Sequence, residues 1–173
     1  MPETNELPKN LTPVLQELLN YWTGACERLG QLPSLDDLNL IDIYKIAPRL
    51  FVGDRCQDEA GRVRYLWRFW GTSLCTFVGG DLTGKFLDQT HDQDATTAAT
   101  KYYEWALENH NPHHCRQAIS VVGSERTYWD YERLIVPVAD RSGHPGHVIG
   151  VYFSEQEDQC IRPNRYRYSG VLS

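Results

Sequence analysis

The order of the predicted elements indicates an α+β fold in which helices are segregated beside an antiparallel sheet. Two β-like runs joined by a hairpin loop come first, and three more, joined by two further hairpin loops, follow a helical middle section. Strands connected by short loops pair antiparallel, and helices grouped between them cover one face. A chain of 173 residues with 41% hydrophobic residues is typical of one globular domain with a packed core.

The first element is an amphipathic helix predicted over residues 11–29. Its apolar residues recur with the i, i+3, i+4, i+7 spacing that places them on one side of a helix. Thr12-Pro13 is a favourable start and Gly30 a favourable stop for such a helix. Residues 1–10 contain two prolines and no periodicity, so we expect a flexible lead there.

A turn at residues 31–34 leads into one or two short helical turns within residues 35–47. These end before Pro48, because the residue that precedes a proline disfavours the helical backbone conformation. The first hairpin follows. It is predicted as a strand over 50–54, a loop over 58–62 and a return strand over 63–70.

The helical middle section has four predicted parts: a helix over 72–78, a turn at 79–81, a helical turn at 85–87 and a longer helix over 92–109. Three strands come next, over residues 114–122, 128–139 and 147–154, with hairpin loops at 123–126 and 140–146. The polar, Arg- and Tyr-rich residues 155–173 predict a tail that is partly disordered or docked on a partner.

Composition excludes several functional classes. The net charge of −6 argues against nucleic-acid binding, which requires a basic surface. No apolar run approaches the roughly 20 residues needed to span a bilayer, so no membrane association is expected. The five cysteines are odd in number and form no Cys-x-x-Cys pair, which indicates reduced thiols and a cytoplasmic protein.

The chain contains no motif typical of catalysis or metal binding. The only cluster of metal-ligand residue types is His110, His113, His114 and Cys115, whose spacing matches no standard zinc site. Adjacent His113 and His114 would point to opposite faces of an extended chain. No metal site and no catalytic residue are therefore predicted. A small α+β enzyme that uses His91 or His114 with Asp88 stays open as an alternative.

Four sequence blocks resemble a PAS domain, and more closely a bacterial family of short, mostly stand-alone PAS-like proteins. The blocks are Tyr21-Trp22 with residues 31–34; residues 46–52; residues 68–72 with 80–84; and residues 131–137 with 149–153. The resemblance implies one domain over residues 11–154, with a five-stranded antiparallel sheet, short helices on one face and the N-terminal helix outside the sheet or across a dimer. It also implies sensing or protein–protein interaction rather than catalysis. The cofactor remains unknown, although some PAS sensors hold haem through one histidine, here His91 or His110.

Strand alternation sends Tyr65, Trp67 and Phe69 to one face of the sheet, and Leu66, Arg68 and Trp70 to the other. The simplest interpretation is core packing. The sharper hypothesis is a small-molecule slot beneath the helices, lined by Trp67, Phe69, Phe77, Arg133 and Tyr152. Arg133 would either pair with Asp81 or Asp88 or bind an anionic ligand.

A second set of residues is predicted to form contacts with other proteins: Leu15, Leu18, Trp22, Leu66 and Trp70. The apolar stripe of the N-terminal helix can be buried against its own sheet or against a second copy, and a homodimer is expected. The function predicted from the sequence is a sensory or adaptor module that binds a small ligand, an unidentified signalling protein, or both. A ligand-free interaction module is the remaining alternative.

Overall fold

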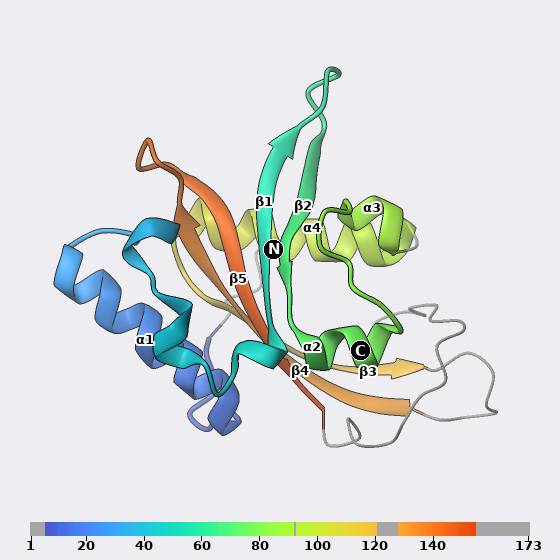
Figure 1. Cartoon of the computed structure of the whole chain (residues 1–173), viewed down its shortest axis with the longest axis horizontal. Helices are drawn as coiled ribbons and strands as arrows, with labels where there is room; N and C mark the ends of the chain where they lie inside the picture. Colours follow the sequence, from blue (N-terminus) through green and yellow to red (C-terminus); the bar gives the residue numbers. More distant parts are fainter. Residues whose placement is uncertain (1–5, 92, 121–127, 155–173) are drawn as a thin grey trace.

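The computed structural model describes residues 6–91, 93–120 and 128–154 (Figure 1). Five strands form one antiparallel sheet in the order β2-β1-β5-β4-β3. The bounds are β1, Leu50–Gln57; β2, Val63–Trp70; β3, His113–Ser120; β4, Tyr128–Ala139; and β5, Pro145–Phe153. The first hairpin joins the last three strands where β1 pairs with β5, so the two halves of the chain share one sheet. The α+β class and the five-stranded sheet predicted from the sequence are confirmed.

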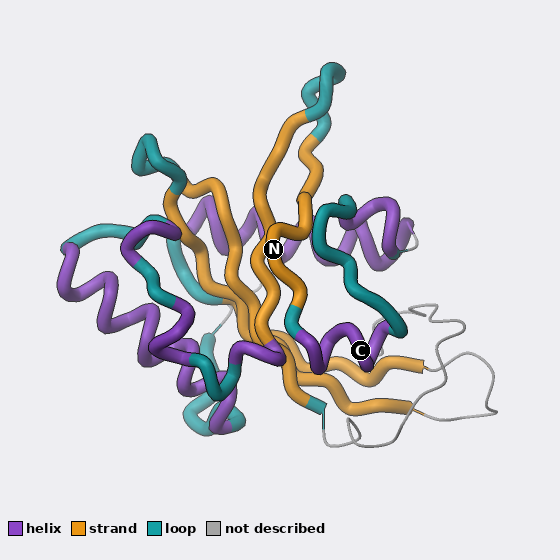
Figure 2. The backbone as a smooth tube through the Cα atoms, viewed as in Figure 1, coloured by secondary structure: helices purple, strands orange, loops and turns teal. Residues whose placement is uncertain are grey.

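Helical segments cover both faces of this sheet, as the tube view also shows (Figure 2). The inner face is the one covered by α2 (Thr72–Val78), α3 (Leu87–Thr90) and α4 (Gln93–Asn109). The outer face is covered by α1 and three short 3-10 turns. Their bounds are α1, Pro13–Leu29; η1, Leu35–Asp37; η2, Leu40–Ile43; and η3, Ala47–Arg49.

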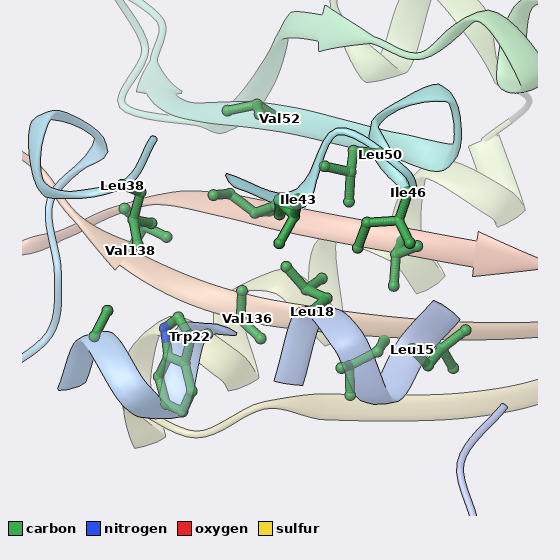
Figure 3. Close-up of a cluster of buried hydrophobic side chains, with 14 residues drawn as sticks. Leu15, Leu18, Trp22, Leu38, Ile43, Ile46, Leu50, Val52, Val136 and Val138 are labelled. Carbon is green, nitrogen blue, oxygen red and sulfur yellow. The ribbon is translucent and has the colours of Figure 1, made fainter. Parts of the chain in front are cut away.

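Helix α1 begins and ends where its sequence predicts. Pro13 occupies the first turn after Thr12, and Gly30 adopts the left-handed conformation (φ 68°) that ends the helix. The apolar stripe of α1 packs against the apolar residues of the outer face, where Leu15, Leu18 and Trp22 point toward β4 and β5 (Figure 3). The sheet residues of this outer core are Leu50, Val52, Leu134, Val136, Val138, Ile149 and Val151.

Polar contacts fix α1 at two points along its length. The indole Nε1 of Trp22 donates a hydrogen bond to the carbonyl of Pro137 at 2.7 Å. At the other end, the Thr12 hydroxyl donates to the carboxylate of Glu132. The sequence allowed the apolar stripe of α1 to be buried against its own sheet or against a second copy. In the structure it packs against its own sheet. The roles predicted for Leu15, Leu18 and Trp22 in an interface, and the homodimer itself, remain predictions.

A β-bulge in β2 corrects the predicted alternation of that strand. Val52 of β1 pairs with Phe69, but the next residue, Gly53, pairs with Trp67, so Arg68 is an extra residue without a direct partner. Beyond the bulge, inward and outward positions exchange. Trp70 therefore lies in the inner core, whereas Phe69 lies on the outer side of the sheet and is 36% exposed. The predicted placement of Phe69 and Trp70 was wrong for this reason.

Candidate ligand site on the inner face

Aromatic rings fill the space between the inner face and helices α2 to α4. The ring centroids of Phe51 and Trp67 are 5.3 Å apart, those of Trp67 and Trp70 4.8 Å, and those of Tyr65 and Tyr103 4.9 Å. Trp67 and Tyr152, both predicted to bind a ligand, belong to this buried cluster. Aromatic side chains supply large apolar contact areas for a core and for a flat ligand alike.

Arg133 extends the inner cluster from β4 toward helix α4. Its side chain is nearly buried, at 7% exposed, and its guanidinium lies 5.4 Å from the ring centroid of Tyr102 and 5.6 Å from that of Tyr103. Such contacts hold a cation against the electron-rich face of a ring. The predicted pairing with Asp81 or Asp88 was wrong. Asp81 accepts from the backbone N–H of Thr83, and Asp88 pairs with Arg64 beside its own helix.

His113 and His114 point to opposite faces, as predicted for an extended chain. His113, on β3, packs against Tyr102 (4.6 Å between centroids) and Trp105 (5.5 Å) on α4. His114 faces outward, with its Nε2 2.9 Å from a carboxylate oxygen of Glu132. Within the described residues, no group of three or more His, Cys, Asp or Glu side chains is arranged to hold a metal ion.

Burial and neighbouring charge keep the ring of His113 neutral. Loss of solvent and the nearby Arg133 guanidinium lower the pKa of His113 to about 4. Both causes disfavour the charged imidazolium, since a buried charge loses hydration and like charges repel. At neutral pH the His113 ring is therefore an uncharged group with one N–H donor and one acceptor nitrogen.

Buried polar atoms without a hydrogen-bond partner in the part of the chain that the structure describes include the indole Nε1 of Trp70 and the Nδ1 of His113, both on the inner face. Buried polar groups nearly always have a partner, because an unpaired one loses its hydration without compensation. A hydrogen bond from a bound molecule to either atom would restore the partner that burial removes.

A polar lock ties the first hairpin to α4. Arg55 of β1 contacts Glu104 through two nitrogens, with Nε–Oε1 and Nη2–Oε2 distances of 2.8 Å, and the hydroxyl of buried Tyr65 donates to the same carboxylate. Burial alone raises the pKa of Glu104, but the hydrogen bonds from Arg55 and Tyr65 outweigh it and hold the pKa below its ordinary value. In Tyr65, burial and the bond to Glu104 raise the pKa of the phenol.

The depressed pKa of Glu104 predicts how this lock responds to pH. The ionised carboxylate favours the folded state at every pH above the unfolded pKa, and that contribution disappears as the pH falls through the folded pKa. Glu104→Gln is expected to lower the free energy of unfolding at pH 7 by about 1–2 kcal/mol, allowing for partial exposure. It should also flatten the decline in stability between about pH 5 and pH 3. Urea unfolding across this range, with exposed Glu108→Gln as the control, measures both effects; equal slopes for the two variants would contradict the assignment.

The remaining predicted residues are dispersed or lie outside the described residues. The side chain of Phe77 is outside them. Phe69 and Leu66 lie on the outer side of β2. The alternative pair of His114 with Asp88 is not assembled, because Asp88 bonds to Arg64 and His114 bonds to Glu132. The Nδ1 of His91, the other histidine of that alternative, lies 2.8 Å from the hydroxyl of Thr90. Sequence reasoning missed the part that α4 plays; its signal was the aromatic group Tyr102, Tyr103 and Trp105 in one helix.

Residues 11–153 match the family model described as PAS domain. The chain belongs to the PAS domain family. This confirms the resemblance seen in the sequence blocks, and PAS domains are in general sensory rather than catalytic. A comparison with curated proteins finds no match. Among the described residues, no helix is both long enough and apolar enough to cross a membrane.

Solved structures similar to this PAS domain include a light-oxygen-voltage domain studied with a flavin analogue. It is 15% identical, with a TM-score of 0.47 over 72% of this chain and 90% of that one. The LOV protein of Rhodobacter sphaeroides is 14% identical, with a TM-score of 0.44 over 70% of each chain. A PAS domain from Colwellia psychrerythraea is 14% identical, with a TM-score of 0.42 over 67% of this chain and 97% of that one.

Proposed function

We propose that this PAS domain is a sensory module of a signalling pathway that binds a small ligand on the inner face of its sheet. The observation that carries the proposal is the unpartnered indole N–H of Trp70 within the aromatic cluster. Ligand sites in proteins combine apolar and aromatic walls with a few fixed polar groups. Trp67 and Tyr152 would supply the walls, and Trp70 and Arg133 the polar groups.

The signal would leave through a protein partner. The outer side of β2 offers a surface for this contact, where Leu66 is partly exposed and Phe69 is more so. Arg68, whose Nη2 lies 2.8 Å from a carboxylate oxygen of Asp54, borders the same surface. A homodimer is part of this proposal, as is a cytoplasmic location. The location is supported by the four described cysteines that are free thiols.

Native mass spectrometry and an absorption spectrum of freshly purified protein test the ligand. We expect a mass above that of the bare chain, or visible absorbance, that identifies a co-purified molecule. Trp70→Phe retains an aromatic ring, though a smaller one, and removes the donor, so bound ligand should fall by about tenfold, the value of one hydrogen bond in a buried site.

Trp22→Phe is the matched control, because it makes the same change on the outer face and should leave ligand occupancy unchanged. A bare mass without visible absorbance in the wild-type protein would contradict ligand binding and favour a ligand-free interaction module. Equal ligand loss in both variants would show that general destabilisation, and not the Trp70 donor, is responsible.

A further inference from the structure

His113 gives the inner face a chemical preference, and the inference drawn from it rests on the proposed ligand-binding function. The His113 side chain is 8% exposed, and its Nδ1 is buried without a partner among the described residues. In the tautomer that carries the proton on Nδ1, this buried nitrogen is a hydrogen-bond donor. A ligand atom that pairs with His113 in that tautomer accepts a hydrogen bond.

The charge beside His113 is positive. The Arg133 guanidinium acts on its ring as a cation, and no carboxylate acts on it among the described residues. The carboxylate of Glu104 on α4 is occupied by Arg55 and Tyr65. A positive field in a buried site favours a negative ligand, because the attraction between opposite charges is stronger where water is excluded.

The rings beside His113 favour a flat ligand. Tyr102 lies at 30° to the plane of the histidine ring, and Trp105 meets that ring edge-on at 71°. Tyr131 stacks on Tyr152 nearby on the sheet, with centroids 5.4 Å apart. Tyr102, Trp105 and Tyr131 are partly exposed, so a ring can approach them from the surface. Flat rings pack against aromatic side chains in offset or edge-on arrangements.

We propose that the inner face binds an aromatic carboxylate, whose carboxylate accepts a hydrogen bond from His113 beside the positive charge of Arg133 and whose ring packs against Tyr102 and Trp105. A carboxylate suits this position because an anion accepts a stronger hydrogen bond than a neutral oxygen does. His113 and Arg133 thereby determine the class of ligand, while Trp67 and Trp70 contribute to the apolar body of the site.

Nuclear magnetic resonance titration of His113 in the intact protein tests the proposal. A carboxylate bound beside the ring stabilises the imidazolium, so the pKa of His113 should rise by about 1–3 pH units when benzoate, phenylacetate or indole-3-acetate saturates the site. Benzamide has the shape of benzoate without the charge and should bind about tenfold more weakly or not at all. Inorganic phosphate distinguishes an aromatic carboxylate from an anion of any kind.

Variants give a second readout by calorimetry. His113→Phe should weaken benzoate binding by about tenfold, and Arg133→Gln by at least as much. His114→Phe is the matched control, because the neighbouring residue faces the outer side and should leave affinity unchanged. The titration of the wild-type protein decides the matter if a variant does not fold.

Three results would overturn the proposal: no binding of any of the three carboxylates at millimolar concentration, equal binding of benzoate and benzamide, or tighter binding of phosphate than of benzoate. A neutral co-purified ligand would overturn this inference while leaving the sensory function intact.

Discussion

Leu18→Ala is expected to lower the free energy of unfolding by about 2–5 kcal/mol, the range for removing a buried leucine side chain without refilling its space. Leu18 is 1% exposed and lies between α1 and the apolar residues of β4 and β5. Urea unfolding followed by tryptophan fluorescence and circular dichroism measures the change. The loss should not depend on protein concentration, because the Leu18 side chain is buried against its own sheet.

Glu27→Ala provides the control on the same helix. Its side chain is exposed, so the substitution should change stability by less than about 0.5 kcal/mol. Two results would contradict packing of α1 on its own sheet. One is a small effect of Leu18→Ala, and the other is an effect that grows with dilution, which would show that the stripe of α1 is buried against a second copy.

Gly150→Ala is expected to destabilise the inner core by about 1–3 kcal/mol or more. A Cβ atom at this position of β5 would lie 2.0 Å from the tip of the Phe51 ring, well inside van der Waals contact. That ring cannot move aside freely, because Trp67 and Tyr103 pack against it at 5.3 and 6.1 Å between centroids. Thermal unfolding of the variant measures the cost.

Gly24→Ala is the matched glycine substitution. Gly24 lies within α1, is exposed and has no atom within 4 Å of the added Cβ. It should raise stability by about 0.5–1 kcal/mol through helix propensity alone. A double variant, Gly150→Ala with Phe51→Leu, should recover part of the loss if the clash with the ring is its cause. A harmless Gly150→Ala variant would show that the ring of Phe51 has room to move.

The sequence was most informative where structure is determined locally. The period of the apolar residues and the residues flanking them placed α1 correctly, because helix formation and capping depend on neighbours three or four positions apart. The hairpin loops predicted at 58–62 and 140–146 likewise placed the strands that pair across them, whereas the loop predicted at 123–126 lies outside the described residues. The four sequence blocks carried the family resemblance, and from it came the arrangement of the elements in one sheet.

The bulge at Arg68 could not be predicted, because it depends on how β2 pairs with β1 and not on β2 alone. A strand without a bulge, in which side chains alternate between the two faces throughout, fits the residues of β2 equally well. The single extra residue exchanged the faces assigned to Phe69 and Trp70, and with them the two functions predicted for these side chains.

The polar part of the candidate site depends on contacts between distant segments. Asp88 is engaged by Arg64, which lies 24 positions away in the sequence, and His113 is buried by rings of α4. Nothing in the residues next to Arg133 indicates that the rings of Tyr102 and Tyr103 lie beside its guanidinium. The position of Arg133 on β4 was predictable from the sequence, but the residues that surround its side chain were not.

The packing of α1 determines where the domain can be truncated without exposing its core. A fragment that starts at β1 would retain all five strands, yet it would leave Val136, Val138 and Ile149 facing water. Exposed apolar surfaces of that kind promote aggregation. A fragment made for protein production therefore has to include the N-terminal helix, which covers the outer face of the sheet. A fragment whose boundary is drawn from the strands alone would be insoluble for reasons unrelated to its function.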